Sequence, residues 1–313
     1  MDRVLQVASI SDSLNNALKD QFNTVRLWEQ EDPEAFINEN ADAFDVLVTN
    51  ASTGADASLQ ARFPNLKLIV TRSVGYDQID VAAAHAKSIE VCNTPGVLNA
   101  CVADCAMALM LDVVRQVSLA DRYVREGRWL QAAFPLTTRV TGKKLGILGL
   151  GQIGSEIAKR AAGFDMEIGY HNRREKPGVD ARYFSDAVEL AAWSDVLMVV
   201  VSSSSQEPPL ITAKVLDALG ESGYLVNVAR GFVVDEPVLV DYLSRGKIAG
   251  AGLDVFAAEP NVPDALLSLD NVVLSPHTAS GTHETREAMS QLVLDNIAAY
   301  LEGKPLITPI ESL

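Results

Sequence analysis

The sequence predicts an α/β protein made of two doubly wound, Rossmann-like domains with parallel sheets and an active-site cleft between them. Three observations predict this fold class. The length of 313 residues exceeds the usual size of one domain. Short β-branched runs alternate with helical patterns in two successive series, and a long helical stretch separates the two series.

The first series fills the first hundred residues. Its expected strands are Val4–Ala8, Thr24–Trp28, Asp45–Thr49, Lys67–Thr71 and Ile89–Cys92. Helical patterns lie between these runs, at Ser13–Asp20, Pro33–Asn40, Ala57–Phe63 and Ile79–Ala86. Strands separated by helices are typical of a parallel sheet that is covered on both faces.

The second series follows one long helix, expected from about Ala100 to Glu126, where Gly127 ends it. Its expected strands are Lys144–Leu148, Glu167–Tyr170, Asp195–Val201, Tyr224–Val228, Gly250–Val255 and Asn271–Ser275. Helices fit at Gln152–Gly163, Ala187–Ser194, Ala213–Leu219, Pro237–Arg245 and Glu284–Glu302. Ligands of such folds bind beyond the carboxyl ends of the strands, so we expect the chemistry there.

The charge of the chain limits its partners. With 41 acidic and 26 basic side chains the formal net charge is −15, and such a surface repels phosphate backbones and anionic lipids. We therefore expect neither nucleic acid nor membrane as a partner, and an anionic ligand needs a local positive spot. No apolar run is long enough to cross a bilayer and the N-terminus lacks a signal-peptide pattern, so we expect a cytoplasmic protein. The three cysteines are expected to be reduced, half-buried thiols.

A glycine-rich motif predicts a dinucleotide site. It runs Gly149-Leu150-Gly151-Gln152-Ile153-Gly154 and matches G-x-G-x-x-G. The motif directly follows an apolar run and opens a helix. In that context the glycines permit a tight turn, close approach of a pyrophosphate and close helix–strand packing. A plain strand–turn–helix is the alternative interpretation.

The end of the next strand indicates NADP(H) rather than NAD(H). NAD-binding versions of the motif place an acidic residue there, about 20 residues on, for the ribose 2′-hydroxyl. Here Asn172, Arg173 and Arg174 stand at that place. An amide and two guanidiniums can bind a 2′-phosphate that a carboxylate would repel. We expect NAD(H) to bind less well; alternatively, both arginines are solvated and pair with Glu175.

Three later strand ends carry Arg230, Glu259 and His277. Parallel strands bring their ends to one edge, so these side chains could converge. Reduction of a 2-oxo acid needs a proton for the carbonyl oxygen, and imidazole is the side chain that titrates near neutral pH. Glu259 could hold the imidazolium, and Arg230 could bind the substrate carboxylate and polarise the carbonyl. A capped loop histidine and an Arg-Gly turn are the alternatives.

These motifs resemble the D-isomer-specific 2-hydroxyacid dehydrogenases over nearly the whole chain. The resemblance extends to the NADP-dependent glyoxylate/hydroxypyruvate and hydroxyphenylpyruvate reductases. Besides the segments above, it is carried by Arg72–Asp80, Asn93–Gly96, Phe134–Thr138, His171–Arg174 and Phe256–Pro263. It implies an oxidoreductase that reduces small 2-oxo acids, such as glyoxylate or hydroxypyruvate, to D-2-hydroxy acids with NADPH and a histidine proton donor.

The resemblance also implies site residues. The catalytic residues would be Arg230, Glu259 and His277. Substrate would contact the backbone of Val74 and Gly75, Arg230, His277 and Trp129, which by composition alone would belong to the core. Cofactor contacts beyond the glycine motif and Asn172–Arg174 would be Ser202, Val228, Ala229, Arg230, Asp254, His277 and Ser280. Ser202–Ser205 replaces a frequent Cys-Pro or Leu-Pro pair beside the adenine, and Thr278–Ser280 replaces a glycine-containing stretch.

Domain organisation and assembly follow from the same resemblance. Residues 1–98 with 283–313 would form the substrate domain, and residues 99–282 the NADP-binding domain. Members of the family are homodimers joined through the cofactor domain.

Two other functions stay open. A nucleotide-sensing corepressor-like protein has the same fold, and phosphoglycerate dehydrogenase is a related enzyme that usually prefers NAD. Metal hydrolysis is not expected, because the four histidines show no H-E-x-x-H spacing. The sequence does not specify the side chain of the substrate.

Overall fold

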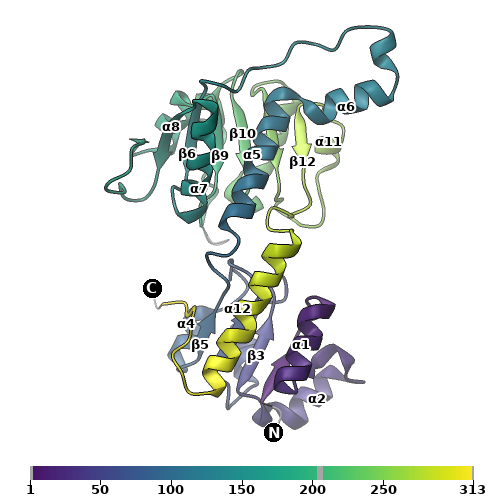
Figure 1. Cartoon of the computed structure of the whole chain (residues 1–313), viewed down its shortest axis with the longest axis vertical. Helices are drawn as coiled ribbons and strands as arrows, with labels where there is room; N and C mark the ends of the chain where they lie inside the picture. The colour runs from purple at the N-terminus through teal and green to yellow at the C-terminus, as the bar shows by residue number, and fades with distance from the viewer. Residues whose placement is uncertain (1–2, 203–206, 312–313) are drawn as a thin grey trace. The chain divides into compact units, whose positions relative to one another are not determined.

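The computed structural model describes residues 3–202 and 207–311 of the chain. The chain divides into two compact units (Figure 1). Unit 1 is Met1–Leu98 with Thr282–Leu313, and unit 2 is Asn99–Gly281. Each unit has its own sheet, and every pairing between neighbouring strands of these sheets is parallel. The predicted α/β class with two parallel sheets is confirmed.

Unit 1 contains a five-stranded sheet in the order β2-β1-β3-β4-β5. Its strands are β1 (Val4–Gln6), β2 (Val25–Arg26), β3 (Val46–Thr49), β4 (Leu68–Thr71) and β5 (Glu90–Cys92). Its helices are α1 (Asp12–Phe22), α2 (Pro33–Asn40), α3 (Ala57–Ala61), α4 (Val81–Ala86) and α12 (His283–Leu301). The strand order reverses between β1 and β3, as in other doubly wound folds.

The two faces of this sheet carry separate apolar clusters because successive strand residues point to opposite sides. In β4, Leu68 and Val70 belong to the cluster that contains Val293 and Ile297 of α12, whereas Ile69 belongs to the other cluster. The segment after α12 then continues along the sheet edge, where the backbone N–H of Ile310 donates to the carbonyl of Val91 at 2.7 Å. The C-terminal helix and tail are thus integral parts of unit 1.

Unit 2 contains a seven-stranded sheet in the order β12-β11-β10-β9-β6-β7-β8. Its strands are β6 (Lys144–Leu148), β7 (Glu167–His171), β8 (Arg182–Tyr183), β9 (Val196–Val199), β10 (Tyr224–Asn227), β11 (Gly250–Leu253) and β12 (Val272–Leu274). The order reverses between β6 and β9, and the glycine motif directly follows β6. Ligands of open α/β sheets bind at such a reversal.

Helices cover both faces of this second sheet. They are α5 (Asn99–Arg115), α6 (Val117–Arg125), α7 (Gln152–Ala161), α8 (Ala187–Trp193), α9 (Ala213–Leu219), α10 (Glu236–Ser244) and α11 (Asp264–Leu267). Side chains of α8, α9 and α10 pack in one apolar cluster with strand residues such as Leu148 and Leu253. On the other face α5 contacts β10, β11, β12 and α7 (Figure 1).

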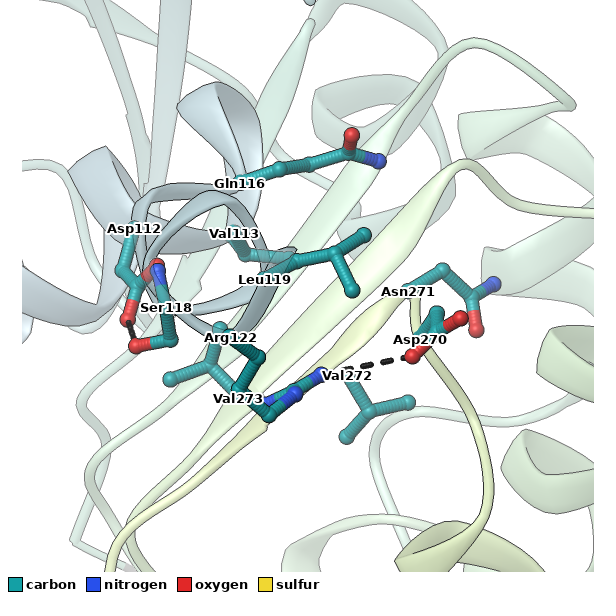
Figure 2. Close-up of a pocket in the computed structure, with 10 residues that line it drawn as sticks. All are labelled: Asp112, Val113, Gln116, Ser118, Leu119, Arg122, Asp270, Asn271, Val272 and Val273. Atoms are coloured by element: carbon teal, nitrogen blue, oxygen red, sulfur yellow. Dashed lines mark hydrogen bonds and ion pairs between the residues drawn. The ribbon is translucent and has the colours of Figure 1, made fainter. Parts of the chain in front are cut away.

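The prediction of one continuous helix over residues 100–126 is wrong, because the helix breaks at Gln116. This residue has a left-handed backbone with a φ of 53°. The carboxylate of Asp112 accepts a hydrogen bond from the backbone N–H of Ser118 at 2.7 Å and also binds its hydroxyl (Figure 2). Asp112, near the end of α5, thus satisfies an N–H group in the first turn of α6, and left-handed Gln116 separates the two helices.

The same junction forms a small groove against the start of β12 (Figure 2). The guanidinium of Arg122 on α6 and the carboxylate of Asp270 close it with an ion pair of 3.3 Å. Asp270 precedes β12, so the groove lies at the amino ends of the strands, whereas the glycine motif lies at their carboxyl ends. The groove anchors α6 and is no candidate for the cofactor.

Smaller predictions also need correction. The strand expected at Thr24–Trp28 is only β2, because Leu27–Glu29 form a 3-10 turn. The sequence patterns missed β8 and α11, which are two and four residues long. The interpretation of Trp129 as a core residue is wrong, since it is 67% exposed. No helix within the described ranges is long and apolar enough to span a membrane.

Candidate active and cofactor sites

The glycine motif forms the turn between β6 and α7. Gly149 has a φ of 103°, which side-chain-bearing residues rarely adopt, and its N–H donates to the carbonyl of His171 at 3.0 Å. A Cβ atom on Gly149 would lie 2.8 Å from the carbonyl oxygen of Val200, and one on Gly154 would lie 2.3 Å from the carbonyl oxygen of Gly149. The first and third glycines are therefore required for packing.

The second glycine differs from the other two. A Cβ on Gly151 would meet no atom within 4 Å, so open space lies in front of the first turn of α7. Gln152 and Ile153 begin that helix, and the N–H groups of a first helical turn have no partners within the helix. A dinucleotide pyrophosphate needs such space and such donors, so the residues present fit this cofactor.

The segment after β7 contacts the glycine turn through Asn172. Its Oδ1 accepts a hydrogen bond from the N–H of Leu150 at 2.7 Å. Arg173 and Arg174 follow and are exposed. Neither arginine forms an ion pair with a described residue, Glu175 included, and the alternative that both are solvated loop residues stays open. Two guanidiniums without a counter-charge thus stand next to the turn.

Lys176 is a residue of this site that the sequence analysis did not single out. Its Nζ donates to the hydroxyl of Ser155, in the first turn of α7, at 3.3 Å. Its backbone N–H donates to the Tyr170 hydroxyl at 3.0 Å, which fixes the loop. The signal was present in the sequence as a third cation within the run Arg173–Lys176.

The turn after β10 positions Arg230. The side chain of Asn227, 1% exposed, accepts from the N–H of Ala229 and donates to the carbonyl of Arg230, both at 3.0 Å. Gly231 then packs directly against the next strand end, where a Cβ would lie 1.9 Å from the carbonyl carbon of Phe256. The Nη1 of Arg230 donates to the carbonyl of Ala229 at 2.8 Å. Asn227 is a positioning residue that the sequence analysis missed.

Glu259 and His277 are in direct contact. The Oε2 of Glu259 lies 2.6 Å from the Nδ1 of His277, and its Oε1 accepts from the N–H of Phe256 at 3.0 Å. The glutamate is thus held by its own loop while it holds the imidazole. With Nδ1 facing a carboxylate, Nε2 is the nitrogen that remains for a substrate.

The loop that carries His277 depends on Asp254, which is 1% exposed. Its Oδ1 accepts from the Ser275 hydroxyl at 2.6 Å and from the N–H of Thr278 at 2.8 Å. Its Oδ2 accepts from the N–H of Ala279 at 2.9 Å, and its carbonyl accepts from the N–H of His277 at 2.8 Å. His277 itself has a left-handed φ of 53°. Asp254 therefore determines where the imidazole lies.

The predicted trio is therefore arranged along one edge of the sheet. The strands β10, β11 and β12 are neighbours and run parallel, and Arg230, Glu259 and His277 follow their carboxyl ends in that order. Glu259 and His277 contact each other, and Arg230 lies on the adjoining turn. The other expected cofactor contacts in unit 2 are Ser202 after β9, buried Val228 and Ala229 after β10, and Ser280 after the histidine loop. Ser203–Ser205 lie outside the described residues.

The predicted carboxylate binders Val74 and Gly75 belong to unit 1, in the loop that follows β4. The carbonyl of Val74 accepts from Asn93 Nδ2 at 2.8 Å, and the carbonyl of Gly75 accepts from the Ser73 hydroxyl at 2.5 Å. Their own N–H groups make no hydrogen bond to a described residue. The loop thus has its carbonyls fixed and two N–H groups available.

The family follows from comparison with known proteins. Residues 107–279 match the model of the D-isomer specific 2-hydroxyacid dehydrogenase, NAD binding domain. The chain belongs to this family. The matched residues include the glycine turn, the two arginines after β7 and all three members of the trio. As in the family model, the seven-stranded unit of this dehydrogenase is a nucleotide-binding fold.

Relatives cover nearly the whole of the dehydrogenase chain. It is 44% identical to a glyoxylate/hydroxypyruvate reductase A of Arabidopsis thaliana and 43% identical to a hydroxyphenylpyruvate reductase of Plectranthus scutellarioides, over 98% of each chain in both cases. A solved structure, the NADPH-dependent glyoxylate/hydroxypyruvate reductase of Sinorhizobium meliloti in complex with NADP and malonate, superposes with a TM-score of 0.91. That comparison has 40% identity and covers 98% of this chain and 96% of the other.

Replacing Asp254 with Asn is expected to destabilise unit 2 and release the histidine loop. The Asn side chain has one acceptor oxygen where Asp has two, so at least one of the N–H groups of Thr278 and Ala279 loses its partner. The free energy of unfolding should fall by about 1–3 kcal/mol as a result. We expect the melting temperature to fall by roughly 3–10 °C and hydrogen exchange in residues 275–280 to accelerate. Glu221→Gln, an exposed carboxylate in the same unit, is the control. Unchanged exchange in the loop would contradict the role of Asp254.

Proposed function

We propose that this dehydrogenase reduces small 2-oxo acids to D-2-hydroxy acids with NADPH. The Glu259–His277 contact is the observation that carries the proposal. It places an oriented imidazole at the carboxyl edge of the sheet whose glycine turn fits a dinucleotide. The reductases of Arabidopsis and Sinorhizobium named above support glyoxylate and hydroxypyruvate as substrates.

The cofactor is held by the loops that follow β6 and β7. Bound NADPH supplies the hydride that adds to the 2-carbon of the substrate. The first turn of α7, beside the open space at Gly151, would hold the pyrophosphate, and Arg173 and Arg174 would hold the 2′-phosphate. An acidic residue at Asn172 would repel that phosphate, so NADH is the weaker donor. Ser202, Val228, Ala229, Asp254 and Ser280 complete the cofactor contacts.

The trio performs the proton transfer and orients the acid. His277 donates a proton from Nε2 to the carbonyl oxygen as hydride reaches the 2-carbon, and Glu259 stabilises the imidazolium that precedes the transfer. Arg230 binds the substrate carboxylate and the developing oxyanion.

We assign the remaining substrate contacts to unit 1. Its residues 1–98 and 283–313 would form the substrate domain, with the cofactor domain over residues 99–282. The available N–H groups of Val74 and Gly75 suit a carboxylate, as pairs of backbone donors do in anion-binding nests. Trp129 would contact the substrate of a partner subunit.

The proposed reaction is tested with a panel of 2-oxo acids and both reduced cofactors. We expect NADPH oxidation with glyoxylate, hydroxypyruvate or 4-hydroxyphenylpyruvate, followed at 340 nm in the steady state. Absence of turnover with every acid would reject the reductase and favour a nucleotide-sensing protein of the same fold. Faster turnover with NADH than with NADPH would contradict the assignment of the phosphate site.

Replacing His277 with Asn removes the proton donor but keeps a polar side chain of similar size. General acids of this kind typically contribute about 10²–10⁴-fold to the rate, so kcat is expected to fall by that factor. The affinity for NADPH, measured by fluorescence titration, should change less than threefold. Comparable losses in both quantities would assign His277 a structural role.

Replacing Arg173 and Arg174 together with Ala tests the phosphate site. Charge-assisted hydrogen bonds contribute about 1.5–3 kcal/mol each, so the ratio of kcat/KM with NADPH to that with NADH should drop at least tenfold. Arg245→Ala, an exposed arginine directly after α10, serves as the matched control. If the ratio is unchanged in the double variant, the 2′-phosphate binds elsewhere.

We propose that the dehydrogenase is a homodimer joined through unit 2. The segment after α6 exposes large apolar side chains: Leu130 is 94% exposed and Leu136 fully exposed. Such side chains mark interaction surfaces. Light scattering should give twice the mass of the chain, and Leu136→Asp should shift it to monomer while Leu267→Asp, an exposed leucine on α11, does not. A monomer at all concentrations would reject the dimer.

A reducing compartment such as the cytoplasm suits this function. The three cysteines, all within the described residues, form no disulfide. Burial raises the pKa of Cys92 to about 12, and burial with the charge of Asp254 raises that of Cys105 to about 11, so both thiols stay protonated. Reduced thiols and a supply of NADPH are both cytoplasmic conditions.

A further inference from the structure

Arg72 in unit 1 carries a positive charge without a counter-charge. It directly follows β4, its guanidinium is half-buried, and its buried Nε has no hydrogen-bond partner among the residues described. Burial, with the nearby charge of Arg286, lowers the pKa of Arg72 to about 10. Buried arginines are normally paired, because an uncompensated charge is costly to remove from water. The surroundings of Arg72 therefore lack an anion.

Arg286 reaches the same place from α12. Residues seven apart share a helix face, and Arg286 precedes fully buried Val293 by seven positions. Val293 packs in one cluster with Val70 of β4 and Cys92 of β5. Arg286 is half-buried as well, and within the described ranges no carboxylate forms an ion pair with either arginine.

Thr94 adds a hydroxyl between the two strands. Val70 of β4 pairs with Cys92 of β5, and Arg72 and Thr94 stand two residues further along the two segments. The N–H of Thr94 donates to the carbonyl of Ser73 at 2.9 Å, so the backbone of Thr94 lies beside the residue that follows Arg72. The Oγ1 of Thr94 is fully buried and has no partner in the described part of the chain. The two orphaned polar atoms thus belong to the neighbouring segments that follow β4 and β5.

We propose that Arg72, Thr94 and Arg286 form an anion subsite that binds a carboxylate or phosphate group. Two guanidiniums and a hydroxyl together offer several hydrogen-bond donors. The oxygens of a carboxylate or phosphate group can accept several hydrogen bonds at once. The chain has 15 more acidic than basic side chains, yet none neutralises this pair. A ligand that supplies the missing charge explains why the two cations remain together.

The ligand has two possible sources. It is either a free anion or a second anionic group of a substrate whose 2-oxo acid end is reduced. The second source rests on the proposed reduction of 2-oxo acids, whereas the first does not. Arg72 is two residues before Val74, so the subsite adjoins the loop proposed to bind the substrate carboxylate.

Binding of inorganic phosphate to the full chain tests the subsite without any turnover. Saturating NADP⁺ is present so that the phosphate sites of unit 2 are filled, and sodium chloride keeps the ionic strength constant. We expect a saturable rise of the melting temperature with phosphate in the wild-type protein. Arg286→Gln and Arg72→Gln should each weaken the apparent affinity at least tenfold.

Matched variants separate this site from general charge effects. Arg62→Gln removes an arginine of unit 1 that already pairs with Glu34, and should leave the phosphate response unchanged. Arg286→Lys keeps the charge and should retain part of the phosphate response. Comparison with this variant shows whether the glutamine variant loses the response through the missing charge or through a folding defect. A wild-type phosphate response in both Arg72→Gln and Arg286→Gln overturns the proposal.

Steady-state kinetics identify the source of the anion. If a substrate supplies it, Arg286→Gln raises the KM for 2-oxoglutarate about tenfold more than the KM for 2-oxobutyrate. If a free anion occupies the site, phosphate affinity falls while the ratio of the two KM values stays constant. Loss of phosphate binding in the variants would support the subsite even if no 2-oxo acid were reduced. Failure of the proposed function can therefore be distinguished from failure of the anion subsite.

Discussion

The buried carboxylate of Asp254 is the group on which the geometry of the candidate active site depends. One side chain accepts three hydrogen bonds from the loop that follows β12, and its carbonyl accepts a fourth from His277. The strained, left-handed backbone of His277 is maintained by these bonds. Glu259 then fixes the ring itself, so the loop and the imidazole are held by two carboxylates from one strand end.

Several of the 26 basic side chains of this acidic chain follow strand ends. Arg173, Arg174 and Lys176 follow β7, Arg230 follows β10, and Arg72 follows β4. These positions are also where a doubly wound fold leaves backbone N–H groups and open space for a ligand. The net charge of −15 repels anions in general, so local cations at these places favour the binding of a charged ligand there.

The errors of the sequence analysis have local causes. No glycine or proline within residues 100–126 marks the break at Gln116. The break follows from a side chain, Asp112, that accepts from an N–H group in the first turn of the next helix instead of pointing to solvent. Short elements such as β8 were missed because two residues show no periodicity. Trp129 was assigned to the core from its hydrophobicity, although position in the fold determines exposure.

The sequence by itself determined the two series of parallel strands, the glycine turn after β6 and the residue types of the proposed catalytic trio, because periodicity and glycine spacing are local properties. It also placed an amide and two arginines where the second strand of the cofactor sheet ends. Only the tertiary structure revealed that Glu259 contacts His277, that Asp254 and Asn227 hold the loops, and that Arg72 lies near enough to Arg286 to be affected by its charge. These residues are up to 214 positions apart (286 − 72), and proximity at such separation depends on sheet order and helix packing.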